Sequence, residues 1–342
     1  MPEYSISTSL DKIPKSGIRK LFDLAQNMEG IISLGIGEPD FSTPPHIVEA
    51  SINALKQGKT YYSPNSGLLE LRQAISEKMK NQNRIDASEN EILITVGGGE
   101  ALSLAIQSSI RVGNDVIIPS PAFVSYIPIV MLSGGNPIEV ECKEEEKFIL
   151  SSDILEEKIT ENTELLILNS PSNPTGSVMT KNDLEKISDI IIEYNLKVIS
   201  DEVYESLVYD GKKHVSIASL NGMENNVVTI NSFSKTYSMT GWRVGYLASK
   251  DPILFDRMLK LHMYGPVCNN TFAQFGALEA LKGPQDSVEY MRSEFEDRRN
   301  LLLDRIKEMS GVRALKPEGA FYVFLNISET GMKSEEFSEK LL

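Results

Sequence analysis

The stretch Ser232-Phe-Ser-Lys-Thr-Tyr-Ser-Met-Thr-Gly-Trp-Arg-Val-Gly-Tyr246 places one lysine among hydroxyl side chains, directly after the apolar run 227–230. Arg243 follows Lys235 by eight residues and lies between two glycines, Gly241 and Gly245. A lysine in such a setting suits a Schiff base with a carbonyl cofactor, and an arginine suits the binding of a phosphate. We therefore expect a site for a phosphorylated carbonyl compound here.

This stretch has two other interpretations. A lysine followed by threonine and tyrosine is usually a solvated surface residue, so the rest of the chain has to support a function. Ser232-Phe-Ser-Lys235 also matches the S-x-x-K pattern of serine acylation in penicillin-binding enzymes. That class needs S-D-N and K-T-G partners, and neither string occurs in the chain. Serine acylation is therefore excluded.

The composition is that of an ordinary globular protein with room for one large domain and a smaller one. Of the 342 residues, 41% are hydrophobic and 24% are charged. The formal net charge of −14 disfavours nucleic acid and anionic membranes as partners, because both attract basic surfaces. A local positive pocket for an anionic cofactor remains compatible with this balance.

The few cysteines and histidines argue against several site classes. Cys142 and Cys268 are the only cysteines, and the three histidines are scattered, which leaves little support for a disulfide framework, a zinc site or a histidine triad. There is no basic-then-apolar leader and no apolar run near the roughly 20 residues of a membrane span. We expect a soluble protein of the reducing cytoplasm.

Short apolar runs alternate with helical patterns along the chain. Leu68, Leu71, Ile75 and Met79 share one face of a helix over 68–80, and Thr180 is the expected N-cap of a helix over 181–194. Alternating strands and helices predict an α/β fold with a mostly parallel sheet, whose ligands bind beyond the carboxyl ends of the strands. The predicted strands are 92–96, 116–118, 165–168, 196–199 and 227–230.

Polar residues that could take part in chemistry follow two of these runs. Asn173 lies in the proline-rich turn 169–176, where its fixed amide suits a hydrogen bond to a cofactor oxygen. Asp201 ends a strand and suits either a helix N-cap or a partnership with a buried cation, such as a protonated pyridine nitrogen. Tyr204 follows three residues later and is expected beside the same ring.

Gly97-Gly-Gly99 leads from a predicted strand into the apolar stretch 101–112. Glycines allow backbone N–H groups to approach a phosphate, and the helix dipole favours its charge. This signal is weak alone, and it gains weight beside Ser232 and Arg243 because a phosphate normally needs several donors.

The chain, from near its start to about residue 325, resembles the class I/II, fold-type I aminotransferases that use pyridoxal 5′-phosphate (PLP). The resemblance implies a large PLP-binding α/β domain over 46–283, with a sheet of the seven-stranded type. It also implies a small α+β domain made of 1–45 and 284–342. It rests on six ordered motifs: Gly35-Ile-Gly-Glu-Pro-Asp40, Tyr62-Ser-Pro-Asn-Ser-Gly67, Gly97-Gly-Gly-Glu-Ala101, Asn173-Pro-Thr-Gly176, Asp201-Glu-Val-Tyr204 and Ser232–Gly245.

The resemblance implies a role for each matching residue. Lys235 would carry the cofactor and shuttle a proton at the substrate α-carbon, Asp201 would pair with the pyridinium nitrogen, and Asn173 and Tyr204 would bind the phenolic oxygen. Phe123 would stack on the ring and Gly37 would meet the substrate carboxylate through its backbone. Tyr62 would reach the phosphate from the partner of a homodimer, although a core tyrosine is the other interpretation. The remaining phosphate ligands would be Gly98, Gly99, Ser232 and Arg243.

The expected reaction is transfer of an amino group from an L-amino acid, aspartate or glutamate or a broader set, to a 2-oxo acid. The alternatives are a β-eliminating PLP lyase on the same fold and a non-catalytic or degenerate PLP-binding protein. The sequence stops at Leu342 inside the predicted helix 334–342, whereas relatives typically continue into a strand with the arginine that clamps the substrate α-carboxylate. We therefore expect cofactor binding to persist and turnover to be reduced.

Overall fold

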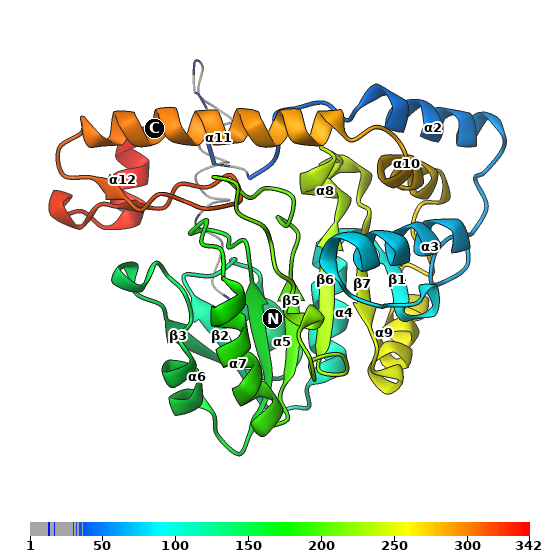
Figure 1. Cartoon of the computed structure of the whole chain (residues 1–342), viewed down its shortest axis with the longest axis horizontal. Helices are drawn as coiled ribbons and strands as arrows, with labels where there is room; N and C mark the ends of the chain where they lie inside the picture. Colours follow the sequence, from blue (N-terminus) through cyan, green and yellow to red (C-terminus); the bar gives the residue numbers. More distant parts are fainter. Residues whose placement is uncertain (1–12, 14–16, 18–29, 31, 33, 36) are drawn as a thin grey trace, which may run out of the picture.

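The computed structural model describes residues 13, 17, 30, 32, 34–35 and 37–342 of the chain. Its centre is a seven-stranded sheet with the order β1-β7-β6-β5-β4-β2-β3 (Figure 1). Neighbouring strands are parallel except where β7 is involved, since β7 is antiparallel to β1 and β6. The predicted mostly parallel sheet is confirmed. The strands are β1 (Ile92–Thr95), β2 (Asp115–Ser120), β3 (Asn136–Glu141), β4 (Thr163–Asn169), β5 (Lys197–Asp201), β6 (Val227–Ser232) and β7 (Gly245–Ser249).

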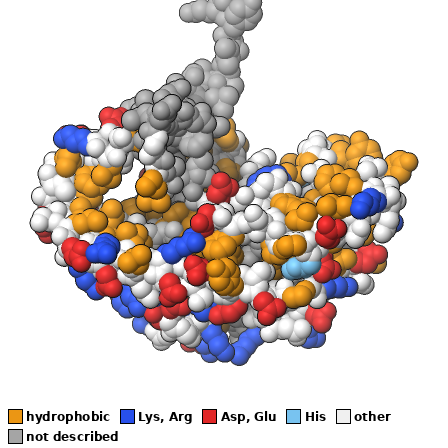
Figure 2. Space-filling model, turned by 90° about the horizontal axis from the view of Figure 1, so that it is seen from above, with side chains coloured by type: hydrophobic (Ala, Val, Ile, Leu, Met, Phe, Trp, Pro, Cys, Tyr) orange, Lys and Arg blue, Asp and Glu red, His pale blue; other side chains and the backbone are white. Residues whose placement is uncertain are grey.

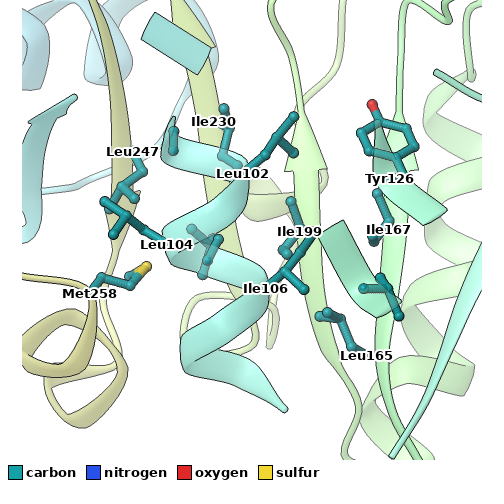
Figure 3. Packing of buried hydrophobic residues seen from close by; sticks show 14 of the residues in the cluster. Leu102, Leu104, Ile106, Tyr126, Leu165, Ile167, Ile199, Ile230, Leu247 and Met258 are labelled. Atoms are coloured by element: carbon teal, nitrogen blue, oxygen red, sulfur yellow. The ribbon is translucent and has the colours of Figure 1, made fainter. Parts of the chain in front are cut away.

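Helices pack on both faces of the sheet and along its β1 edge. One face is covered by α4 (Gly97–Ser109), α5 (Tyr126–Leu132) and α9 (Pro252–Tyr264), and the other by α6 (Ser152–Lys158) and α7 (Lys181–Glu193). Buried apolar side chains of α4 lie directly against the strands in Figure 3. The group beside β1 and β7 consists of α2 (Pro45–Lys56), α3 (Leu69–Lys78) and α10 (Thr271–Lys282).

The structure refines two of the predicted helices. Thr180 caps α7 as expected, because its hydroxyl accepts from the Asp183 N–H at 3.3 Å while the Asp183 carboxylate accepts from the Thr180 N–H at 2.9 Å. The predicted helix 68–80 is α3, which passes into a π-helical turn, Met79–Asn83. Three of its four predicted apolar residues are buried, since Leu71, Ile75 and Met79 are each at most 1% exposed. The fourth, Leu68, is the N-cap of α3 and is partly buried.

The glycines before the predicted stretch 101–112 belong to a helix themselves. The α4 helix begins at Gly97 and ends at Ser109. Gly97 has a φ of +72°, a conformation that glycine adopts without a steric penalty. The Glu100 carboxylate accepts a hydrogen bond from the N–H of Val96 at 2.5 Å. The glycines therefore form the first turn of α4, where backbone N–H groups lack intrahelical partners.

Two strands of the sheet, β3 and β7, were absent from the sequence prediction. In β3 only Val140 is buried, because this strand lies at the edge of the sheet. Exposed glutamates flank Val140 on both sides. The β7 strand contains a glycine, an alanine and a serine among its five residues, so its apolar run is too short to recognise. It follows the β6–α8 region directly and pairs Gly245 with Ser232.

The carboxyl ends of β4, β5 and β6 bring distant residues to one edge of the sheet. Asn169 at the end of β4 is opposite Asp201 at the end of β5, and Asp201 is opposite Ile230 in β6. Directly after β6 comes the short helix α8 (Phe233–Thr236), which carries Lys235. Figure 1 shows α8 between the end of β6 and the long helix α11 (Asp286–Lys307). The predicted convergence of polar residues at this edge is therefore present.

The C-terminal part contains α11, the two-stranded sheet of β8 (Arg313–Ala314) and β9 (Leu325–Asn326), and α12 (Ser334–Leu341). The division into a large domain of 46–283 and a small domain of 1–45 and 284–342 is kept as a proposal. Much of 1–45, including Ile36 of one motif, lies outside the described residues.

On the face seen in Figure 2, acidic and basic side chains are intermixed, so no uniformly basic field covers that face. Short 3-10 turns lie at Glu89–Glu91, Glu144–Glu146, Ile217–Ser219, Thr240–Trp242 and Ser328–Thr330.

Candidate active site

Lys235 is a half-buried amine without an anionic partner in the described chain. Ser232 caps α8 by accepting from the N–H of Ser234 at 3.2 Å, which turns the chain sharply after β6. The Nζ atom donates to the carbonyl of Gly37 and lies 5.9 Å from the ring centroid of Tyr204. Burial lowers the pKa of Lys235 to about 8, with an opposing effect from Glu38. A fraction of the amine is therefore neutral, and hence nucleophilic, at neutral pH.

Asp201 is a buried carboxylate that also lacks a cation in ion-pair contact among the described residues. It is 4% exposed and accepts from the hydroxyl of Tyr126 at 2.7 Å and from the N–H of Val203 at 3.3 Å. Burial raises its pKa to about 6, although both hydrogen bonds oppose the rise. Asp201 begins no helix, so the N-cap interpretation is wrong. A buried carboxylate with this hydrogen-bond support suits a cationic ligand atom.

A cradle for an anion lies beside α8, formed by the start of α4 and by Arg243. At Gly99 an added Cβ would meet nothing within 4 Å, and at Gly98 it would lie 3.7 Å from the Cβ of Ser232. Arg243 is exposed, has no ion pair among the described residues, and donates to the carbonyl of Thr240 at 2.9 Å. Free N–H groups at a helix start and an unpaired guanidinium are the donors that phosphate prefers.

Close packing brings this cradle together. A Cβ at Gly245 would lie 2.6 Å from the carbonyl carbon of Gly97, so β7 approaches the first turn of α4 backbone to backbone. Asn269 is 2% exposed and donates to the carbonyls of Thr95 at 2.5 Å and Arg243 at 2.9 Å. Asn269 therefore ties the end of β1 to the loop that carries the arginine. Sequence reasoning missed it, because no motif surrounds it.

Asn173 and Tyr204 converge on one point, which is occupied by the hydroxyl of Tyr322. The Asn173 amide donates to the Tyr322 oxygen at 3.2 Å, and the Tyr204 and Tyr322 oxygens are 2.7 Å apart. Gly37 lies against the same hydroxyl, and a Cβ there would collide with it. Tyr322 was absent from the sequence prediction. The only available signal was the aromatic pair after Pro317-Glu-Gly-Ala320.

Phe123 and Tyr62 have different places relative to this cluster. The Phe123 ring packs edge-on against that of Tyr126, with centroids 5.5 Å apart, and so lies near Asp201. Tyr62 is 84% exposed, so its interpretation as a core residue is wrong. The structure brings together Lys235, Asp201, Asn173, Tyr204, Gly37, Gly98, Gly99, Phe123, Ser232 and Arg243, and leaves Tyr62 on the surface of the single chain.

The family model described as aminotransferase class I and II matches residues 29–342. The chain belongs to this family. Members of the family depend on PLP, and the predicted family, fold class and enzyme class are confirmed. The chain is an aminotransferase. Among the described residues, no helix is long and apolar enough to cross a membrane.

Named relatives cover nearly the whole chain. The aromatic-amino-acid aminotransferase 2 of Thermococcus litoralis is 50% identical over 99% of this chain and 87% of its own length. The aspartate aminotransferase of Pyrococcus abyssi gives the same three values. A crystal structure titled Pyrococcus protein-A1 superposes with a TM-score of 0.95, at 50% identity over 98% of this chain and 87% of its own.

The residues present fit PLP by three observations. Asp201 offers a buried negative charge for a protonated ring nitrogen, Lys235 offers a partly neutral amine for a carbonyl carbon, and α4 with Arg243 offers donors for a phosphate. Each group lacks an ionic partner in the described part of the chain. These three features match the three reactive groups of a single ligand that carries a pyridinium, an aldehyde and a phosphate.

Proposed function

We propose that this aminotransferase binds PLP covalently through Lys235 and holds its phosphate with Gly98, Gly99, Ser232 and Arg243. The observation that carries the proposal is a half-buried amine at Lys235 near a buried carboxylate at Asp201, neither with an ion pair among the described residues. A buried charge without an ion-pair partner is costly unless a ligand uses it. Perturbed groups of this kind are typical of functional sites.

When bound, the cofactor supplies a carbonyl that condenses with amines and a ring that withdraws electrons from the substrate α-carbon. The substrate amine would displace Lys235 from the cofactor and so free its amine. Lys235 would then act as a general base and acid, taking the proton from the substrate α-carbon and returning it to the carbonyl-derived carbon of the cofactor. Asp201 keeps the ring nitrogen protonated through a charge-assisted hydrogen bond. Asn173 and Tyr204 donate to the phenolic oxygen, and Phe123 packs on the ring.

The proposed substrates are an L-amino acid as donor and a 2-oxo acid as acceptor. Two relatives with equal identity to this chain bear different names, one for aromatic amino acids and one for aspartate. The names of the relatives are therefore compatible both with a preference for aspartate and glutamate and with a broader range of amino acids. Gly37 supports binding of the substrate carboxylate, since its carbonyl already accepts from Lys235 and places this backbone at the reacting amine.

We further propose a homodimer with shared active sites, in which Tyr62 of one protomer reaches the phosphate of the other. Tyr61 and Tyr62 are each 84% exposed. Their loop is tied to the loop before α10, because Thr271 donates to the carbonyl of Tyr61 at 2.6 Å and Asn65 donates to that of Val267 at 2.8 Å. Large exposed aromatic groups on fixed loops are typical of protein interfaces.

Two unpaired cysteines support a reducing compartment such as the cytoplasm.

A mixing experiment tests the shared site. Neither Lys235→Ala nor Tyr62→Ala is expected to be fully active alone. A mixed dimer, however, contains one site with both intact residues, so mixing the two after unfolding and refolding should restore up to about a quarter of wild-type activity. Light scattering of each preparation gives the oligomeric state. A monomer with full activity would contradict this part of the proposal.

The absorption spectrum of the protein tests the reaction itself. We expect PLP-treated and desalted protein to keep an absorption band of bound cofactor, which Lys235→Ala lacks. Addition of L-aspartate, L-glutamate or L-phenylalanine should convert the band to that of pyridoxamine phosphate with stoichiometric release of the 2-oxo acid. A band that ignores a full panel of amino acids would instead indicate non-catalytic binding. Release of ammonia from a substrate with a β-leaving group would indicate elimination.

A further inference from the structure

Two polar side chains of the active site are in hydrogen-bond contact with a single tyrosine oxygen. The Asn173 amide is 3.2 Å from the Tyr322 hydroxyl oxygen, and the Tyr204 oxygen is 2.7 Å from it. Burial raises the pKa of both tyrosines, and the bond between them adds to the rise at Tyr204 and opposes it at Tyr322. Either tyrosine hydroxyl can donate to the other. The Tyr322 oxygen accepts from the Asn173 amide and shares a hydrogen bond with the Tyr204 hydroxyl.

The backbone that carries Tyr322 is fixed to the Asn173 loop. The N–H groups of Glu318 and Gly319 both donate to the carbonyl of Gly176, at 2.8 and 2.9 Å. The side chain beyond this anchor is only partly buried, and its ring packs edge-on against Tyr204 at 5.7 Å between centroids. A fixed backbone with a partly exposed side chain allows the ring to move without unfolding the turn.

The chemistry of the Tyr322 hydroxyl matches that of the expected ligand. Under the proposed function, Asn173 and Tyr204 donate to the phenolic oxygen of the cofactor. Tyr322 presents a phenolic oxygen to the same two donors. Tyr204 has a single O–H to donate, so the Tyr322 oxygen and the cofactor oxygen cannot both accept from it at the same time.

We propose that the Tyr322 hydroxyl occupies the position of the cofactor's phenolic oxygen in the cofactor-free protein and leaves when the cofactor enters. This inference rests on the proposed function. In the free protein Tyr322 is a positioning residue, because it keeps the Asn173 amide and the Tyr204 hydroxyl oriented toward one point. It also competes with the cofactor, since its hydrogen bonds must break first. The cofactor-competent state is then only a fraction of the population, which lowers the apparent affinity by that fraction.

The test compares PLP uptake by wild type and Tyr322→Phe, which removes the hydroxyl and keeps the ring. Stopped-flow absorbance gives the association rate constant, and equilibrium titration gives the Kd. Loss of one net hydrogen bond from the free state should raise the association rate constant about five-fold and lower the Kd to a similar extent. The binding of inorganic phosphate should not change, because phosphate needs only the cradle of α4 and Arg243.

Tyr204→Phe sharpens the test, because it removes the closer of the two donors. It should weaken PLP binding by itself. In the Tyr204→Phe background, Tyr322→Phe should give a much smaller gain in PLP association rate and affinity, since the Tyr322 hydroxyl then has only the Asn173 amide as a partner. A purely structural effect of Tyr322 would give the same gain in both backgrounds. Tyr194→Phe is the matched control, because Tyr194 is exposed on the surface and its hydroxyl donates to Glu156 at 3.4 Å, away from the active site.

The outcomes separate this inference from the proposed function. A five-fold gain that disappears in the Tyr204→Phe background supports it. Lys235-dependent uptake with no gain from Tyr322→Phe, or with an equal gain in both backgrounds, overturns it while the proposed function stands. Absence of Lys235-dependent PLP uptake in the wild type overturns both. Tyr322→Leu gives a second variant without the hydroxyl, and thermal unfolding establishes that each variant is folded.

Discussion

Lys78 and Lys235 are both at least half-buried, and they differ in their partners. Lys78, at the end of α3, has a side chain only 9% exposed, forms an ion pair with Glu205 and donates to Asn83 at 2.9 Å. Lys235 in α8 has no ion pair among the described residues, and burial lowers its pKa to about 8. A buried charge with a partner is a structural element, whereas a buried charge without one is available for chemistry.

The acids beside these lysines show the same difference. Burial alone would raise the pKa of Glu205, but Lys78 reverses the direction and the net pKa is lowered. Asp201, four residues earlier, lacks such a partner, and burial raises its pKa to about 6. Between them Glu202, which is 1% exposed, accepts from Ser216 at 2.5 Å and bonds His214 at 2.9 Å. The end of β5 therefore separates a neutralised cluster from an unneutralised site.

Lys235→Ala is expected to have the largest effect on activity. The change removes both the amine that binds the cofactor and the base that moves the α-proton. Loss of a general base alone typically costs about 10²–10⁴-fold in rate, so we expect a loss of at least about 10³-fold in single-turnover amino transfer. The midpoint of thermal unfolding should stay the same or rise, because an unpaired buried amine is removed. A variant that retains more than a tenth of the rate would contradict the role of Lys235.

Lys78→Met is expected to affect stability instead. It leaves the Glu205 carboxylate buried without its cation, and breaking such a pair typically costs about 3–5 kcal/mol. Urea unfolding of the free protein measures the change. The matched control is Lys260→Met, which breaks an exposed ion pair with Asp256 whose side chains are 63% and 69% exposed. An equal loss in both variants would show that the burial of the Lys78–Glu205 pair has no special effect.

The sequence predicted the unneutralised site better than the neutralised cluster. Asp201 ends β5, and Asn173 and Lys235 follow β4 and β6 within four residues. Their positions after apolar runs place them at one edge of the sheet. The Lys78–Glu205 pair joins residues 127 positions apart, and Tyr126 reaches Asp201 over 75 positions. No local pattern marks these contacts, because they depend on how α3 and α5 pack. Tyr322 was missed for the same reason, 149 positions from Asn173.

Asp201→Asn removes the negative charge of the Asp201 carboxylate and leaves the size of the side chain nearly unchanged. Loss of one charge-assisted hydrogen bond to the cofactor should slow single-turnover amino transfer by about 10- to 150-fold. Stability at pH 7 should rise, because burial raises the pKa of Asp201 and the ionised form therefore destabilises the folded state. Glu202→Gln is the neighbouring control, and there we expect the reverse pattern of retained transfer and lower stability. Lower stability in Asp201→Asn would contradict the comparison.

The pH dependence of cofactor uptake has the smallest expected effect. Uptake needs the neutral amine of Lys235, whose pKa burial lowers to about 8. The neutral fraction rises about tenfold between pH 7 and pH 9, so the association rate constant should rise to that extent and then level off. The phosphate of the cofactor titrates near pH 6, outside this window. A rate constant that is flat from pH 7 to pH 9 would show that the amine is already deprotonated or that another step limits uptake.

The same pKa sets the sign of a stability effect. The folded pKa of Lys235, about 8, lies below its ordinary value of 10.5. Between these pH values the unfolded chain binds more protons than the folded one, so stability rises with pH in that window. Below pH 8 the contribution of Lys235 is constant and unfavourable. The difference in the free energy of unfolding, wild type minus Lys235→Met, should therefore increase from pH 8 to pH 10. A lysine paired with a carboxylate would not give this increase, because the carboxylate holds up its folded pKa.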